Sequence, residues 1–204
     1  VLLFWMLKIS KIKHVLFLLV FITTTSCSDI IHENNTSKET KLIKLSTNMG
    51  DITIELYQDK APETVANFLK YTKEGRLNGT IFHRVIPNFM IQGGGHLPDM
   101  SQIDTFDPII NESDNNISNK KGTIAMARTS SPNSATSQFF INLRDNDFLD
   151  KINAADGYGY CVFGQVTEGI EIVEQIGVVA TGNNAGHSDV PIENIIIKSV
   201  DIIE

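Results

Sequence analysis

The sequence predicts a mainly β domain, in which eight strands form a barrel or a sandwich together with two helices. Three observations support this fold class. Short runs of alternating apolar and polar residues recur along the chain, Gly and Asn residues separate them, and only two segments have a helical pattern. The chain has 204 residues, of which 42% are hydrophobic and 20% charged. These values are typical of one soluble globular domain, with length left for a targeting segment.

The strongest strand signal covers residues 51–57, where Ile52, Ile54 and Leu56 alternate with polar side chains and share one face. Residues 48–51 form a turn before it, so residues 41–47 and 51–57 are expected to pair as a hairpin. The further predicted strands are residues 80–85, 90–92, 122–127, 138–143, 160–166 and 194–203.

Two segments have the pattern of helices. Residues 62–75 begin with Pro62, carry lysine in the last turn and end at Gly75, which are common start and stop signals. Its predicted inner face consists of Val65, Phe68, Leu69 and Thr72. Residues 169–176 form the second helix, with Ile172, Val173 and Ile176 directed inward. Two such helices can close the two ends of a barrel.

Residues 1–27 have the pattern of an export signal. A cationic stretch from Lys8 to His14 precedes an apolar run, and small polar residues then lead to Cys27. The uncharged run of residues 15–28 is shorter than the roughly 20 residues that cross a bilayer as a helix, and it matches a signal-peptide core. Residues 28–40 are polar and aperiodic, so we expect a tether, followed by one domain at residues 41–204.

Cys27 lies where a processed bacterial lipoprotein carries its acylated cysteine. The residues Thr24-Thr-Ser-Cys27 resemble the lipobox, although Thr24 stands where leucine is usual. Acyl chains on Cys27 would anchor the domain to a membrane of the cell envelope on its periplasmic side, whereas cleavage without acylation would give a soluble periplasmic protein. The second cysteine, Cys161, lies in an apolar run and is expected to be a small buried residue.

Composition and motif searches exclude several function classes. The net charge is −7, and residues 1–26 contain three lysines and no acid, so the remaining chain is distinctly acidic. An acidic domain argues against a nucleic-acid partner. Nucleophile-elbow, Walker, His-Glu-x-x-His and Cys-x-x-Cys motifs do not occur, and the five histidines are dispersed, so we expect no metal and no cofactor. His83 is interpreted as a structural residue.

Three segments are candidates for a binding site. Residues 82–94 place Arg84 near Met90 and Gln92, which share a face of one strand and suggest a pocket for an uncharged polar ligand. The alternative is a core strand from which the arginine extends into solvent. Residues 124–142 contain Phe139 and Phe140, which face opposite sides of their strand, so one can enter the core while the other lines a site. The third segment spans residues 146–164, and ordinary barrel core is again the alternative.

These segments resemble the cyclophilin family in its bacterial branch. The motifs Phe82-His-Arg-Val-Ile-Pro, Phe89-Met-Ile-Gln-Gly-Gly, Ser137-Gln-Phe-Phe-Ile and Val162-Phe-Gly occur in the order and spacing of that family. The resemblance extends from about residue 42 to residue 203. It implies a closed eight-stranded antiparallel β-barrel capped by two α-helices, and a peptidyl-prolyl cis–trans isomerase that acts on proline-containing polypeptides.

The resemblance also implies roles for individual residues. Arg84 corresponds to the catalytic arginine and Gln92 to the glutamine beside it. The apolar pocket for the substrate proline corresponds to Phe89, Met90, Phe140 and Leu149. Ala127 and Arg128 match the strand edge that pairs with the substrate backbone. Tyr160 stands where many eukaryotic members have histidine, and Phe148 stands in place of the tryptophan that contacts cyclosporin, so the resemblance does not extend to tight cyclosporin binding.

The expected enzyme is a monomer that assists the folding of exported proteins. Rotation about a peptide bond breaks no covalent bond, so it requires neither a nucleophile nor a metal, which agrees with the motif search. Two alternative functions make different demands on the sequence. A binding module would hold proline-containing segments without needing both Arg84 and Gln92. A hydrolase on a β-barrel would need a nucleophile and a base, and the sequence offers no credible pair.

Overall fold

A computed structural model of the protein describes residues 41–203. The predicted signal peptide (1–27), the polar tether (28–40) and Cys27 lie outside the described residues. The strands are β1 (Lys41–Thr47), β2 (Asp51–Leu56), β3 (Phe82–Ile86), β4 (Met90–Gly93), β5 (Thr123–Met126), β6 (Phe139–Asn142), β7 (Val162–Glu168), β8 (Thr181–Asn184), β9 (His187–Pro191) and β10 (Ile197–Ile202). The helices are α1 (Pro62–Lys73), α2 (Ile170–Ile176) and a short 3-10 helix, η1 (Asp147–Leu149).

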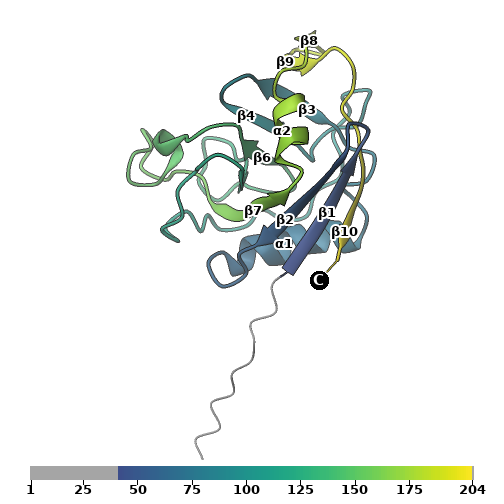
Figure 1. Ribbon diagram of the computed structural model, residues 1–204. Helices are drawn as coiled ribbons and strands as arrows, with labels where there is room; N and C mark the ends of the chain where they lie inside the picture. The colour runs from purple at the N-terminus through teal and green to yellow at the C-terminus, as the bar shows by residue number, and fades with distance from the viewer. Residues whose placement is uncertain (1–40, 204) are drawn as a thin grey trace, which may run out of the picture. The chain divides into compact units, whose positions relative to one another are not determined.

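Eight of the strands form one curled antiparallel sheet, in the order β10-β1-β2-β7-β5-β6-β4-β3 (Figure 1). The two edge strands do not pair by a ladder. They are joined through the isolated bridge between Ile81 and Ile196 and through backbone hydrogen bonds such as Phe82 N to Ile195 O at 2.9 Å. The eight-stranded antiparallel prediction is confirmed, and the barrel closes along this one loosely bonded seam.

The two-stranded sheet of β8 and β9 was not predicted. Its strands are mostly polar, β8 contains Gly182, and Gly186 lies in the turn between them, so neither strand shows the alternation that marks a half-buried strand. The hairpin lies beside β3 at the top of Figure 1. Because its pairing depends on contacts with the rest of the fold, a local pattern could not reveal it.

Strand alternation divides the apolar residues between two faces of the sheet. On β6, Phe139 belongs to the main core, with Ile141 two residues later. Phe140, between them, belongs to a separate cluster with Met90 of β4 and Val162 of β7. Successive side chains of a strand point to opposite faces, so this second cluster lies on the outer face of the sheet, where β4, β6, β5 and β7 are neighbours.

Helix α1 packs its apolar face on the core near the lower end of the sheet in Figure 1. Pro62 occupies its first turn, where the missing N–H costs no hydrogen bond. The backbone N–H groups of Glu63 and Thr64 donate to the carboxylate of Glu112, at 3.2 and 2.8 Å. A carboxylate from a distant loop therefore satisfies free donors at the positive end of the helix.

Helix α2 begins after Gly169, whose backbone is left-handed with φ of 80°. An added Cβ there would lie 2.2 Å from the carbonyl oxygen of Asp51, so glycine is required for both reasons. Val173 and Ile176 are buried as predicted, while Ile172 is only partly buried against the core.

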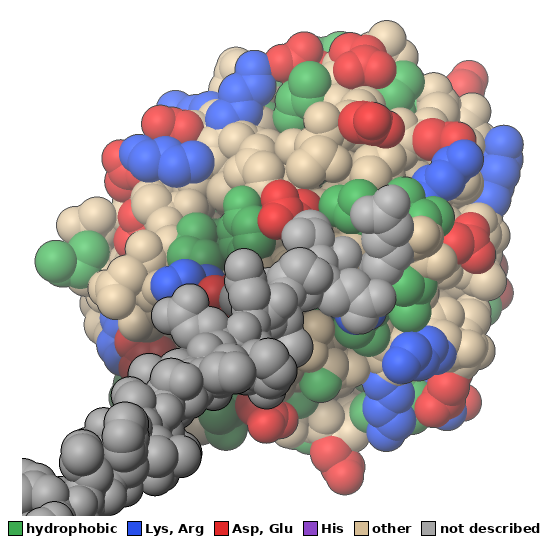
Figure 2. Space-filling view, turned by 60° about the horizontal axis from the view of Figure 1, so that its bottom comes forward, with side chains coloured by type: hydrophobic (Ala, Val, Ile, Leu, Met, Phe, Trp, Pro, Cys, Tyr) green, Lys and Arg blue, Asp and Glu red, His purple; other side chains and the backbone are tan. Residues whose placement is uncertain are grey.

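Within residues 41–203, no helix combines the length and hydrophobicity that crossing a membrane requires. Acidic and basic side chains are interspersed on the visible face of the domain in Figure 2. Cys161 is buried, as predicted, and burial raises the pKa of its thiol to about 12, helped by the nearby carboxylate of Glu112. The thiol is consequently a packing group rather than a nucleophile.

Candidate active site

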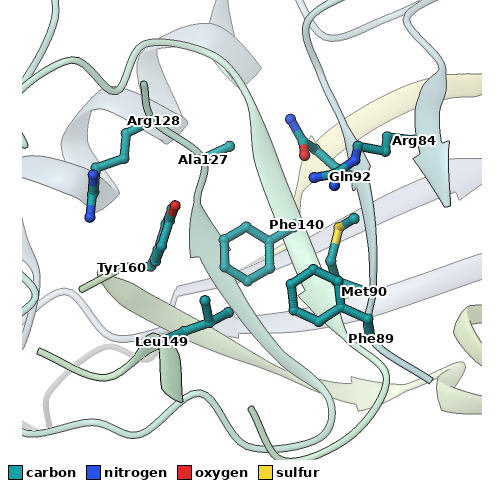
Figure 3. A pocket seen from close by; sticks show the side chains of 9 residues that line it. All are labelled: Arg84, Phe89, Met90, Gln92, Ala127, Arg128, Phe140, Leu149 and Tyr160. Carbon is teal, nitrogen blue, oxygen red and sulfur yellow. The ribbon is translucent and has the colours of Figure 1, made fainter. Parts of the chain in front are cut away.

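A cavity of about 200 Å³ opens on the outer face of the sheet, over the second apolar cluster (Figure 3). Its lining residues are Arg84, Phe89, Met90, Gln92, Ala127, Arg128, Phe140, Leu149 and Tyr160. These are nine of the ten residues that the sequence placed in the site of the folded domain. They come from β3, β4, β6, η1 and the loops between strands, so the curled sheet brings together segments far apart in the chain.

The floor and one wall of the pocket are apolar. Met90 and Phe140 are 2% and 4% exposed, although both border the cavity, because the other side chains of the cluster enclose them. The ring of Tyr160 meets Phe140 edge-on, with centroids 5.7 Å apart. Such a concave apolar surface favours a compact apolar ring, and its volume is below the roughly 300 Å³ at which pockets for drug-sized ligands begin.

The opposite wall carries the polar groups. Arg84 extends from β3 with 43% of its side chain exposed, and its guanidinium lies beside Gln92 above the apolar floor in Figure 3. The Gln92 side chain donates a hydrogen bond through Nε2 to Oε1 of Gln138, at 2.8 Å. The arginine is therefore neither buried in the core nor turned away from Phe140 and Gln92. An arginine at this rim offers several N–H donors to a ligand seated on the floor.

Arg128 lines the pocket but its guanidinium is occupied elsewhere. Its side chain is 3% exposed and donates to the carbonyl of Gly159 at 3.0 Å and to Asp156 at 2.5 Å. The guanidinium also lies 4.4 Å from the ring centroid of Tyr160. This bonding lowers the pKa of Asp156 to about 2 and ties the loop before β7 to the pocket.

Phe148 is the tenth predicted residue, and the structure places it outside the pocket lining. It is 51% exposed and stacks on Phe89, with centroids 5.7 Å apart and planes 28° apart. Its ring thus forms an exposed apolar surface next to the cavity and is not part of the cavity wall.

A second hollow, of about 150 Å³, adjoins the pocket and shares Gln92, Ala127 and Arg128 with it. Thr129, Ser134, Thr136 and Gln138 complete its lining. Together the two hollows form a groove longer than one residue. Such a groove fits a stretch of extended polypeptide.

Sequence reasoning missed the polar residues that hold the site in place. Gln138 precedes Phe140 by two positions on the same strand face, so alternation along β6 could have identified it as a neighbour of Gln92. Asn146 donates to the carbonyl oxygen of Phe89 and to Oδ1 of Asn142, at 2.9 and 2.8 Å. No local pattern marks this asparagine, since both partners are distant in the chain or on another element.

His83, next to Arg84 on β3, faces away from the pocket. It is 4% exposed, and its ring lies 4.4 Å from that of His96. Burial, assisted by the adjacent His96, lowers the pKa of His83 to about 4. The ring is neutral near pH 7 and lies outside the pocket lining, so it has no route to act on a ligand. Among residues 41–203, no set of three His, Cys, Asp or Glu side chains is arranged to hold a metal ion.

Residues 42–202 match the family model described as cyclophilin type peptidyl-prolyl cis-trans isomerase/CLD. The chain is 54% identical over 164 residues to peptidyl-prolyl cis-trans isomerase B of Escherichia coli, covering 80% of this chain and all of that one. It is 52% identical to peptidyl-prolyl cis-trans isomerase cyp18 of Streptomyces antibioticus, covering 79% and 98%.

A crystal structure of a cyclophilin type peptidyl-prolyl cis-trans isomerase from Cryptosporidium parvum superimposes with a TM-score of 0.64 at 28% identity, covering 81% of this chain and 98% of that one. The similarity thus extends over essentially the whole described domain in both sequence and fold. The chain belongs to the cyclophilin-type peptidyl-prolyl cis-trans isomerases, the enzymes that accelerate rotation about the peptide bond before proline.

Proposed function

We propose that the pocket over Met90 and Phe140 binds the substrate proline ring and that Arg84 stabilises the twisted peptide bond. The observation that carries this proposal is the position of the Arg84 guanidinium, which lies beside Gln92 at the rim of an apolar floor. Ala127 lines both the pocket and the adjoining hollow, so an extended substrate that fills both would pass over it.

The chemistry of the reaction suits this arrangement. Resonance holds the X–Pro bond planar, and the barrier to its rotation is roughly 18–20 kcal/mol. A rate increase of about five decades requires lowering this barrier by roughly 7 kcal/mol. In the twisted state the proline nitrogen loses conjugation and gains a localised lone pair. A donor aimed at that nitrogen stabilises the twisted state more than either planar state, which is the differential binding that catalysis requires.

The protein surroundings strengthen that interaction. The apolar floor excludes water around the ring, so the field of a nearby charged donor is less screened. Gln92 is fixed by Gln138 and can orient either the guanidinium or the substrate carbonyl. A second solved structure of the Cryptosporidium parvum protein, obtained in the presence of the dipeptide Ala-Pro, superimposes with a TM-score of 0.62 at 28% identity, covering 80% of this chain and 99% of that one. The presence of a proline dipeptide with that relative supports a prolyl ligand here.

The test compares Arg84→Ala and Arg84→Lys with the wild-type protein in a proline-peptide isomerisation assay and in proline-limited refolding. We expect Arg84→Ala to lose most of the acceleration. Arg84→Lys should recover only part of it, because lysine keeps the charge and lacks the planar fork of donors. Arg76→Ala is the matched control, since Arg76 is similarly exposed and pairs with Glu74 on the surface. Unchanged acceleration in Arg84→Ala would refute the role given to this residue.

We further propose that the enzyme acts on exported or envelope proteins while anchored by acylated Cys27 on the periplasmic side of a bacterial membrane. The support is the order of a cationic stretch, an apolar run and the lipobox-like residues ending at Cys27. Polar residues 28–40 supply the tether that lets the domain reach unfolded chains.

Mass measurement of the mature N-terminus tests the anchor. Acylation at Cys27, together with recovery of the protein in the membrane fraction, is the expected result. Cys27→Ser should release the domain into the soluble fraction without altering isomerase activity. An unmodified N-terminus at another position would contradict anchoring and would leave the soluble periplasmic alternative.

A further inference from the structure

The hairpin of β8 and β9 carries an acidic side chain, Asp189, that the structure pairs with Arg84. Oδ2 of Asp189, on β9, lies 3.9 Å from Nε of Arg84. Both side chains are about two-fifths exposed, at 42% and 43%. Asp189 does not line the pocket, so its contact is with the back of the guanidinium and not with the ligand.

The hairpin is fixed to the barrel on both sides of this residue. Val190 is 2% exposed and packs with Ile81 and Met100 in a small apolar cluster. The ring of His187 meets His96 edge-on, with centroids 5.1 Å apart. Asp189 therefore belongs to an anchored element and holds its position relative to β3.

The backbone at Asp189 adopts a conformation that is unusual for a residue other than glycine. Its φ is 61°, in the left-handed region, and the pairing of β8 with β9 shifts between Gly182 and Asn184. Irregularities of this kind often redirect a side chain near a functional site, and a left-handed non-glycine residue has an energetic cost that the fold must offset. Aspartate and asparagine tolerate this region better than most residues.

We propose that Asp189 is a positioning residue for catalysis, which holds the Nε edge of Arg84 so that the two terminal nitrogens face the pocket. This inference rests on the proposed role of Arg84. An exposed arginine side chain has several rotatable bonds, and a fixed carboxylate at one edge restricts the orientations of its planar group. Gln92 lies beside the same guanidinium, next to the floor of the pocket (Figure 3).

The positioning role and a purely electrostatic role predict changes of opposite sign. Loss of the negative charge at position 189 makes the potential around Arg84 more positive, which would accelerate catalysis if charge alone mattered. If orientation matters, the same change slows catalysis because the guanidinium samples unproductive orientations. Exposed ion pairs contribute up to about 1 kcal/mol, which corresponds to about fivefold, so the expected fall is about two- to fivefold.

The experiment measures kcat and KM for proline-peptide isomerisation in wild type, Asp189→Asn, Arg84→Ala and the double variant. Asparagine keeps the size of the side chain and tolerates the left-handed backbone. We expect Asp189→Asn to lower kcat about two- to fivefold with little change in KM, and to have no further effect when Arg84 is alanine. Asp107→Asn, at an exposed aspartate in the loop beside α1, is the matched control and should match wild type.

The outcomes separate the two proposals. Unchanged or increased kcat in Asp189→Asn, or an equal fall in the presence and absence of Arg84, overturns the positioning role alone. Wild-type activity in Arg84→Ala instead overturns the proposed function on which it rests. Asp189→Gly, which also accommodates the left-handed backbone, should reproduce the effect of asparagine if the missing carboxylate is the cause.

Discussion

Leucine substitutions at Phe139 and at Phe140 should have different effects, because the first residue belongs to the core and the second to the pocket. The two residues are adjacent on β6 but face opposite sides. Phe139 makes edge contacts with Phe68 and Phe82, at centroid distances of 5.6 and 6.0 Å. Each such pair contributes about 0.5–1.5 kcal/mol beyond burial, so Phe139→Leu should lower the free energy of unfolding by about 1–3 kcal/mol.

Phe140→Leu should have its main effect on catalysis. Phe140 has one aromatic neighbour, Tyr160, and the loss of that pair lowers the free energy of unfolding by about 0.5–1.5 kcal/mol. Because Phe140 is only 4% exposed, a proline ring on the phenyl face would bury mainly its own apolar surface; about 60 Å² in total is worth about 1.5 kcal/mol at roughly 25 cal/mol per Å². The loss of this contact corresponds to about a tenfold fall in kcat/KM.

Urea denaturation and a proline-peptide assay, run on both variants at a temperature where both are folded, test this separation. Each variant is the control for the other, since the chemical change is identical and the positions are consecutive. Wild-type kcat/KM in folded Phe140→Leu, or a tenfold loss in folded Phe139→Leu, would show that the assignment of faces to core and pocket is mistaken.

Three other predictions concern stability and reactivity. Gly169→Ala should lower the free energy of unfolding by about 2–5 kcal/mol in urea denaturation, because the backbone there is left-handed and the new Cβ would lie 2.2 Å from the carbonyl oxygen of Asp51. Gly157→Ala is the control; its backbone is also left-handed but has open space around it, so it should cost only about 1–2 kcal/mol. The low pKa of His83, about 4, means that below about pH 6.5 the unfolded chain binds a proton that the folded protein does not. Stability should therefore fall by about 2 kcal/mol between about pH 7.5 and about pH 5, and the fall should be smaller by that amount in His83→Gln; equal slopes would contradict the assignment. Burial raises the pKa of the Cys161 thiol to about 12, so this cysteine should resist thiol reagents until urea unfolds the domain. Peptide mass analysis measures the labelling, and labelling of the native protein would contradict the burial of Cys161.

The alternation of residues along the strands made most of the fold predictable. Strands such as β2 were predicted because their apolar residues repeat every second position, as in Ile52, Ile54 and Leu56, whereas β5 and β6 are buried at every position and were predicted as short apolar runs. Alternation also left open whether these strands form a barrel or a sandwich. That choice depends on which strands pair, and the pairing is set by contacts between distant segments.

The composition of the pocket was predictable mainly from the resemblance to a family. From the residues alone, Arg84 and Gln92 in one motif suggested a pocket with a core strand as the alternative. The structure brings them together with Phe140, while the catalytic role given to them remains a prediction. Two supporting residues, Asn146 and Asp189, were not predictable, because they act through partners that only the folded chain brings near.

The pairing of β1 with β10 has a consequence for biosynthesis. β1 is the first described strand to leave the ribosome, and one of its two neighbours, β10, is the last. Until that strand has been made, the edge of β1 is an open template for pairing with other chains. The sheet of the nascent chain is thus incomplete until β10 has been synthesised, and until then its exposed edge must be protected from aggregation.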